Sequence, residues 1–383
     1  MAGYDYTTAA DPAIAAPGTR AARKADRIHW MLGLPDLSRE IGSPIGLLLE
    51  RVRCASCIKN ADIVTVPEIV SVERNFDLLN TPADHPSRSE SDTFYVSDAD
   101  VLRTQMTAMW TWYLRDRQVR DRLRMEGRVT GVSFGKVYRN DEIDRAHYPV
   151  FHQIDGIGLA NRSAREFEIA DLDAILEQIA LTIFDKGIEM RITDDTFPFT
   201  EPSRQLEVRW NDEWLEVVGA GLVHCGVLSN LGIDPEVYNG WAFGFGLDRL
   251  AMRRLEIPDI RILWSTDERV TSQFTSIDSK FEPVSKFPAT SRDISFLLNK
   301  NTSLNDFYDI VRACSNESDE QIVEQVELVD RYENRGMFGA DRVSYTFRIT
   351  YRSFLRTLMN AEINKAQEGI RRRVERELGA TLR

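Results

Sequence analysis

FGKVYRNDEIDRAHYPVFHQIDG, residues 134–156, contains two extended segments on either side of a charged connection. Their residue types and alternation predict strands over residues 132–139 and 151–159. The same reading predicts further strands over 206–210 and 214–220, and long helices near 101–124 and 169–186. Strands paired by hairpins, with helices on one side, indicate an antiparallel sheet of the α+β class.

The C-terminal part of the chain has a pattern of its own. Residues 293–298, 324–332 and 343–351 have the alternation of strands, whereas 303–314 and 362–378 have helical periodicity. Gly379 is the expected helix stop, and residues 381–383 add a short edge strand. The order β-α-β-β-α-β is that of a ferredoxin-like unit.

The chain of 383 residues is long enough for two ordinary domains. We expect an N-terminal extension over residues 1–84 and a linker over 268–284. Between these two segments, residues 85–267 contain most of the glycine, histidine and aromatic residues, as expected of a domain that carries a functional site. Residues 285–383 form the ferredoxin-like domain.

Charge and composition limit the function classes. The net charge is −12, but residues 286–383 carry 16 basic and 15 acidic side chains, so this part of the chain would tolerate a phosphate backbone best. No run of about 18 apolar residues occurs, so we expect no membrane span. The N-terminus lacks an apolar signal segment, which predicts a cytoplasmic protein, with the mitochondrial matrix or another organelle as the alternative. Cys54 and Cys57 form a single CxxC, which we interpret as reduced thiols rather than a zinc site.

Several segments, met in order, resemble one known family. Residues 134–156 resemble the second signature of class II aminoacyl-tRNA synthetases in its phenylalanine-specific form. FPFTEPS (197–203) resembles the segment that lines the phenylalanine pocket, and GWAFGFGLDRLAM (240–252) resembles the third signature. NFDLLNTPADHPSR (75–88) is similar to the start of the same domain.

Two downstream segments extend the resemblance to the end of the chain. FPATSRDISFLL (287–298) and FRITYRSFLRTL (347–358) resemble the fused anticodon-binding module of the organellar, single-chain phenylalanyl-tRNA synthetases. The resemblance implies activation of phenylalanine with ATP and Mg²⁺, followed by transfer to tRNA(Phe), by a monomer or, alternatively, a dimer. Two other functions stay open: a paralogue that activates a phenylalanine analogue, and a tRNA-binding regulator that charges nothing. A non-catalytic relative should have lost Arg139 or Arg249, and both are present.

The nucleotide must be held by side chains, because residues 240–246 contain no Walker-type GxxxxGK[ST] and no GxGxxG opening a helix. The resemblance implies that Arg139 binds the α-phosphate of ATP, because the two N–H groups of a guanidinium can span phosphate and carboxylate oxygens. The resemblance also implies that the adenine ring is held between Phe151 on one face and Arg249 on the other. The remaining contacts that it implies are His147 on the terminal phosphates, Asp141 on the nucleotide and Glu216 on Mg²⁺.

The resemblance also implies an amino-acid site. Gln153 and Asp155 alternate on one strand, so they face the same side and would hold the α-ammonium group. Phe197 and Phe199 would clasp the phenyl ring edge to face, and the small Ala242 would leave room for it. His152 points to the other face of the strand, so we interpret it as structural.

One segment departs from the family pattern. The family usually has arginine-threonine-histidine-threonine-serine, with glutamine three residues further on; here residues 103–110 read RTQMTAMW. Gln105 takes the place of the histidine near the substrate carboxylate, Thr107 that of the serine and Trp110 that of the glutamine. The identity of the amino acid is therefore open at this stage. For tRNA, the resemblance favours contacts from the terminal helix by Arg371, Arg372, Arg373 and Arg376.

Overall fold

A computed structural model describes residues 2–7, 19–140, 144–184, 187–210, 212–284, 287–316, 320–339 and 341–383. The chain divides into two compact units. The first is built from Met1–Arg139, Pro149–Ile257 and Phe274–Lys280, and the second from Asn140–Tyr148, Pro258–Gln273 and Phe281–Arg383. Within the described ranges, no helix is both long and apolar enough to cross a membrane.

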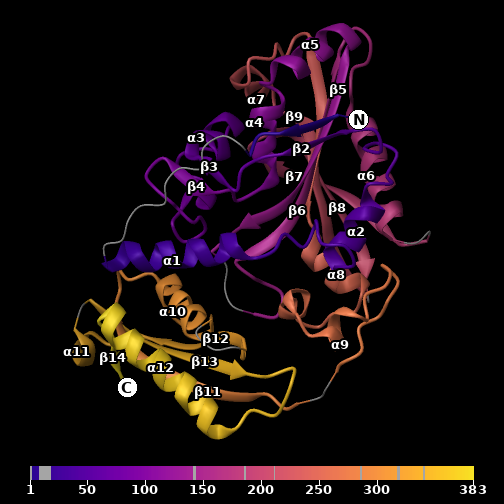
Figure 1. Cartoon of the computed structure of the whole chain (residues 1–383). Helices are drawn as coiled ribbons and strands as arrows, with labels where there is room; N and C mark the ends of the chain where they lie inside the picture. Colours follow the sequence, from indigo (N-terminus) through magenta and orange to yellow (C-terminus); the bar gives the residue numbers. More distant parts are fainter. Residues whose placement is uncertain are drawn as a thin grey trace. The chain divides into compact units, whose positions relative to one another are not determined.

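The first unit is organised around an eight-stranded sheet (Figure 1). Its strands, in spatial order, are β1 (Gly3–Asp5), β2 (Asp62–Thr65), β5 (Arg128–Tyr138), β6 (Val150–Asn161), β10 (Tyr238–Gly246), β9 (Glu213–Val223), β8 (Thr200–Trp210) and β7 (Met190–Phe197). All neighbouring strands in the series β5-β6-β10-β9-β8-β7 are antiparallel, as the sequence predicts, whereas β1 and β2 and also β2 and β5 pair in parallel.

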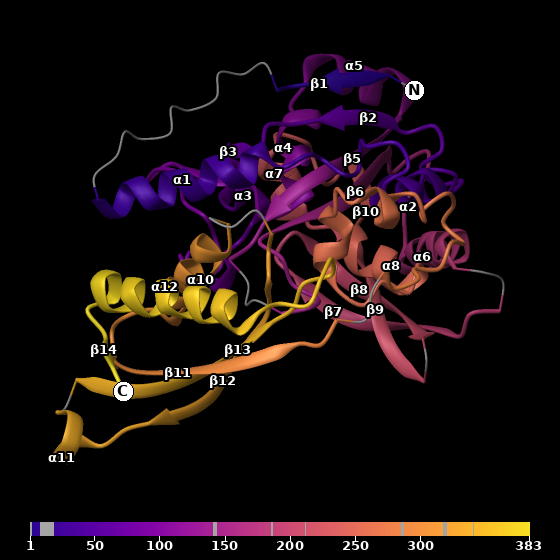
Figure 2. The same cartoon turned by 60° about the horizontal axis from the view of Figure 1, so that its bottom comes forward.

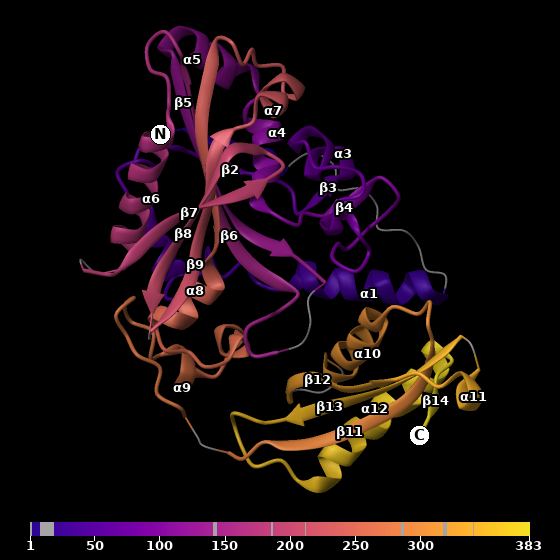
Figure 3. The same cartoon turned by 180° about the vertical axis from the view of Figure 1, so that it is seen from behind.

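Helices cover both faces of this sheet, so the expectation of helices on one side was wrong (Figures 1 and 3). One face carries α2 (Pro44–Val52), α6 (Ile169–Ile183) and α8 (Leu247–Arg254); the other carries α4 (Trp110–Tyr113), α5 (Arg117–Glu126) and α7 (Cys225–Asn230). The central strands β5 and β6 explain this arrangement. Nearly all of their residues are buried, whichever face they point to, so each face needs an apolar cover.

The long helix expected near residues 101–124 was also wrong, because the segment is broken into four pieces. These are strand β4 (Asp100–Leu102), a 3₁₀ turn (Met106–Met109), α4 and α5. Asp116 enforces the last break: its carboxylate accepts hydrogen bonds from the backbone N–H groups of Gln118 and Val119, so it caps a new helix. The break turns residues 105–110 towards β6.

Smaller elements complete the first unit. The helix α1 (Thr19–Gly33) precedes α2, and β3 (Ile69–Ser71) pairs with β4 in a separate two-stranded sheet. The short helix α3 (Val72–Asn75) follows β3.

The second unit contains the predicted ferredoxin-like order β11-α10-β12-β13-α12-β14 (Figure 2). Its sheet runs β12 (Val323–Tyr332), β13 (Arg342–Tyr351), β11 (Thr290–Asn299) and β14 (Thr381–Leu382), and the helices α10 (Leu304–Asn316) and α12 (Asn360–Leu378) cover one face. The strand aromatics Tyr345, Phe347 and Tyr351 are buried under these helices, as expected of core residues. Gly379 ends α12 in the left-handed region, with φ 60°. Two short helices, α9 (Glu268–Thr271) and α11 (Arg335–Phe338), lie outside this pattern.

Candidate active site

Asp155 lies in the middle of the large sheet, on β6 between β5 and β10. Its neighbours in register are Ser133 and Gly244. A Cβ atom at Gly244 would come within 2.9 Å of the Asp155 Oδ2 atom, so glycine is required at that position. The carboxylate accepts hydrogen bonds from the Thr107 hydroxyl and from the Trp110 indole N–H, each at 2.7 Å. The broken segment before α5 therefore delivers two donors to one buried acid.

The charge of this carboxylate has no fixed partner. The Asp155 residue is only 4% exposed, and burial raises the pKa of its carboxyl group to about 7, although the hydrogen bonds from Thr107 and Trp110 act in the opposite direction. No cationic side chain contributes to this shift among the residues that the structure describes. A buried carboxylate without a counter-ion suits a ligand that carries an ammonium group.

Aromatic rings line the space beside this carboxylate. Phe197 and Phe199 are stacked, with centroids 5.9 Å apart and an interplanar angle of 5°. Trp110 meets Phe199 edge to face, at 5.8 Å and 85°. The Phe197 ring lies over Gly219, where a Cβ atom would come within 2.9 Å of it. Ala242 is buried in the same cluster as Trp110.

Gln153 and Gln105 lie close to the residues around Asp155. Gln153 lies two residues before Asp155 and faces the same side of β6. Its side-chain oxygen accepts a hydrogen bond from the Met106 backbone N–H at 3.1 Å, and the residue is half-buried. Gln105 is also half-buried and has extended backbone angles. The structure thus brings the predicted amino-acid residues of β6 and of the 105–110 segment together.

Three of the predicted nucleotide residues also share one region. The Arg139 guanidinium lies over the Phe151 ring, with its central carbon 5.3 Å from the ring centroid. Both Arg139 and Arg249 are exposed, and the charges of both act on Glu216. Two exposed guanidinium groups, one of them over an aromatic ring, form a surface suited to a polyphosphate and a planar base.

Glu216 belongs to a group of acids that the sequence analysis only partly found. Desolvation and the nearby charge of Asp195 raise the pKa of Glu216, and Glu207 adds to the effect; Arg249 and Arg139 oppose it. Glu207 stands opposite Glu216 in the β8–β9 register and also pairs with Arg191. Like charges opposite each other are unfavourable, so a divalent cation would relieve this arrangement. No cluster of three or more metal-ligating side chains is found among the described residues.

His152 points away from this site, as expected. It is fully buried on the other face of β6, where the Leu37 backbone N–H donates to its Nε2 atom at 3.1 Å. Because Nε2 accepts this hydrogen bond, Nδ1 is the donor to Asp248 Oδ1, at 3.1 Å. Asp248 directly precedes Arg249, so this buried pair anchors the first turn of α8. Sequence reasoning missed Asp248.

His147 and Asp141 have a different placement. Asp141 lies outside the described residues. His147 belongs to the second unit, where its Nδ1 atom lies 2.7 Å from Asp144. Burial would raise the pKa of Asp144, but hydrogen bonds from His147 and from backbone N–H groups outweigh it and lower that pKa. In the same loop, Arg145 forms an ion pair with the buried Glu324 of β12.

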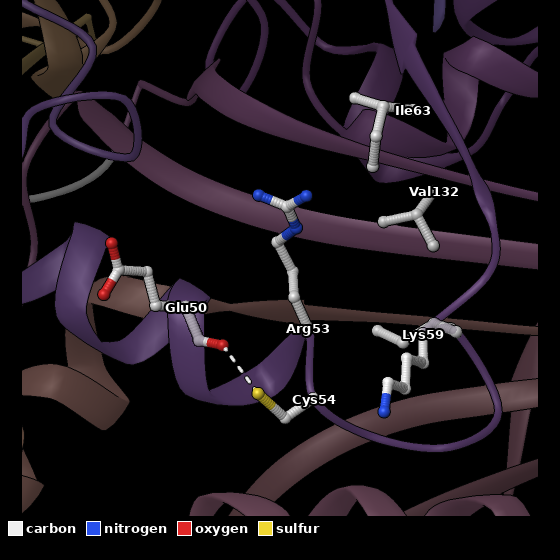
Figure 4. Close-up of a pocket in the computed structure, with 7 residues that line it drawn as sticks. Glu50, Arg53, Cys54, Lys59, Ile63 and Val132 are labelled. Atoms are coloured by element: carbon white, nitrogen blue, oxygen red, sulfur yellow. Dashed lines mark hydrogen bonds between the residues drawn. The ribbon is translucent and has the colours of Figure 1, made fainter. Parts of the chain in front are cut away.

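A surface pocket of about 220 Å³ lies on the opposite face of the sheet (Figure 4). Val132 is adjacent in sequence to Ser133, and because Ser133 shares the face of Asp155, Val132 points to the other face. The Cys54 thiol reaches the Glu50 carbonyl oxygen at 3.5 Å. The pocket is not part of the site around Asp155; its lining residues are Glu50, Arg53, Cys54, Ile58, Lys59, Ile63 and Val132.

The four arginines of α12 are placed in the second unit. Arg372 and Arg376 are exposed, whereas Arg371 and Arg373 are partly buried. Arg372 is paired with Glu368 at 3.1 Å, and Arg376 with Glu377 at 2.8 Å. The Arg372–Glu368 pair is exposed on both sides and contributes little to stability, so the Arg372 guanidinium is available to another anion. The Glu377 side chain is only 6% exposed, whereas that of Arg376 is 70% exposed and reaches solvent.

Comparison with known proteins covers both units. Residues 43–274 match the family model of the tRNA synthetases class II core domain (F), and residues 285–383 match that of the ferredoxin-fold anticodon binding domain. These matches agree with the antiparallel sheet of the first unit and with the strand order of the second.

Curated relatives are similar over most of their length. The chloroplastic/mitochondrial phenylalanine–tRNA ligase of Arabidopsis thaliana is 38% identical over 372 residues, which cover 94% of this chain and 82% of the relative. The mitochondrial phenylalanine–tRNA ligase of Mus musculus is 37% identical, over 82% of this chain and 73% of the relative. That of Saccharomyces cerevisiae is 32% identical, over 82% and 81%. The chain therefore belongs to the class II tRNA synthetases, in the group of single-chain phenylalanine–tRNA ligases with a ferredoxin-fold anticodon-binding domain.

Proposed function

We propose that this protein activates phenylalanine with ATP and transfers it to tRNA(Phe). The observation that carries the proposal is the buried Asp155 carboxylate, which has no counter-ion among the described residues and lies next to the aromatic rings of Trp110 and Phe199. An ammonium group would neutralise the acid, and a phenyl ring would pack against Phe197 and Phe199. An α-amino acid with an aromatic side chain carries both the ammonium group for Asp155 and the ring for Phe197 and Phe199.

The chemistry follows from the charges of the two substrates. The carboxylate of the amino acid attacks the α-phosphorus of ATP, and pyrophosphate leaves. Charge builds on phosphate oxygens, so the protein needs positioning and positive charge more than a nucleophile. Arg139 would bridge the carboxylate and the α-phosphate, while Phe151 and Arg249 would hold the adenine ring between them.

A magnesium ion fits the acids beside the two arginines. Glu216, with Glu207 opposite it, would hold the ion, and their mutual repulsion supports a cation at this place. When bound, the ion would offset the charge of the ATP phosphates. The nucleotide contacts that the resemblance implies for His147 and Asp141 remain predictions.

The partners and the compartment follow from the second unit and from the relatives. Residues 285–383 are proposed to hold the anticodon end of tRNA(Phe), with the exposed arginines of α12 on its phosphates. The named relatives are mitochondrial or chloroplastic ligases, which supports an organelle over the cytosol. We propose a monomer.

Replacing Arg139 with alanine should reduce amino-acid activation roughly a hundredfold or more, because it removes a charge aimed at the transition state. The measurement is phenylalanine-dependent ATP–pyrophosphate exchange. Arg128→Ala is the matched control, since Arg128 is an exposed arginine at the start of the same strand. Equal exchange rates in the two variants would remove Arg139 from the mechanism.

Activation should depend on pH through Asp155. Its carboxyl group has a pKa of about 7 in the free protein and must be ionised to hold an ammonium group. We expect kcat/KM for phenylalanine to rise about tenfold per pH unit below this value and to level off above it. Asp155→Asn should have a low kcat/KM without this rise. A wild-type profile that is flat between about pH 5.5 and 7 would contradict the assignment.

Combined Arg372→Ala and Arg376→Ala substitutions should weaken tRNA charging but leave pyrophosphate exchange intact. Each lost phosphate contact should reduce the slope of log affinity against log salt by about one. Arg117→Ala is the control, because this arginine lies on α5 of the first unit with its side chain 94% exposed. An unchanged salt slope in the double variant would show that α12 is not on the tRNA-binding surface.

A further inference from the structure

Trp110 is in contact with both ends of the amino-acid site. Its indole N–H donates to Asp155 Oδ1 at 2.7 Å, and its ring meets Phe199 edge to face at 5.8 Å. Trp110 itself is 1% exposed. Since a side chain this buried has few alternative rotamers, it fixes both contacts at the same time.

The two groups that Trp110 joins come from separate parts of the sheet. Asp155 is on β6, whereas Phe199 lies in the connection between β7 and β8, and β10 and β9 separate these elements. The Thr107 hydroxyl donates to the other carboxylate oxygen, Asp155 Oδ2. Trp110 therefore connects the Asp155 carboxylate directly to the Phe199 ring, whereas Thr107 holds the carboxylate alone by its hydrogen bond.

We propose that Trp110 is a specificity-determining residue that sets the distance between the amino group and the aromatic ring of the bound amino acid. The site then selects substrates with one methylene group between the α-carbon and the ring. This inference rests on the proposed function, because it assumes that Asp155 holds the amino group and that Phe199 contacts the ring.

The test compares three amino acids that differ only in this distance: phenylglycine, phenylalanine and homophenylalanine, which have no, one and two methylene groups. Pyrophosphate exchange gives kcat/KM for each. A methylene group in a fitted apolar pocket changes kcat/KM by roughly 10–200-fold, so the wild-type protein should prefer phenylalanine by at least about tenfold.

Trp110→Phe keeps a ring against Phe199 but removes the N–H donor. We expect the KM for phenylalanine to rise roughly tenfold, as for a lost hydrogen bond to a charged group, and the preference over homophenylalanine to fall by a similar factor. The KM for ATP should stay unchanged, which a general loss of structure would not allow. Trp110→Gln is the second variant: it retains an N–H donor but lacks the ring, and it should lose length selectivity with a smaller rise in KM.

Thr107→Val is the matched control, because it removes the other donor to Asp155 and leaves Phe199 untouched. It should raise the KM for all three substrates in parallel and keep the preference for phenylalanine. The inference is overturned if the Trp110 variants behave like Thr107→Val, with length selectivity intact. Absence of any phenylalanine-dependent exchange by the wild-type protein would instead refute the proposed function.

Discussion

The buried carboxylate of Asp155 is the constraint around which the candidate site is arranged. An ionised acid inside a sheet is unfavourable unless donors and a counter-charge reach it. The break in the chain before α5 supplies two donors, Thr107 and Trp110, and Gly244 leaves room for the carboxylate. The described residues supply no cation to it, so the missing charge is left to a ligand. This is why we propose that the ammonium group of an amino acid binds at Asp155.

The antiparallel sheet joins this pocket to the nucleotide region. The strand β6 carries Phe151 and Asp155 four residues apart, and an even spacing directs both side chains to one face. On β5, Arg139 directly follows the strand and lies over Phe151. One hairpin thus places Arg139, Phe151 and Asp155 near one another, which agrees with the proposed roles of phosphate binding, base stacking and ammonium binding.

Much of this was predictable because the deciding patterns are local. Alternation identifies β5, β6, β8 and β9 and the three long strands of the ferredoxin-like domain, and helical periodicity identifies α10 and α12. The strand β10 was missed, since its sequence YNGWAFGFG is rich in glycine, which is unfavourable in strands. Packing across the sheet explains two of these glycines: a Cβ atom at Gly240 would meet the Gly158 carbonyl oxygen, and one at Gly244 would meet Asp155. The role of Trp110 was equally hidden, because its partner Asp155 lies 45 residues away and no local pattern connects them.

The central claim is that the site accepts phenylalanine, and ATP–pyrophosphate exchange with each of the twenty standard amino acids tests it most directly. The account predicts strong exchange with phenylalanine and a much weaker signal with tyrosine, of the order of a hundredfold less for a pocket that selects by shape. Exchange led by another amino acid would mean that Trp110 and Gln105 have changed the specificity. Exchange with none of the twenty would contradict the account as a whole.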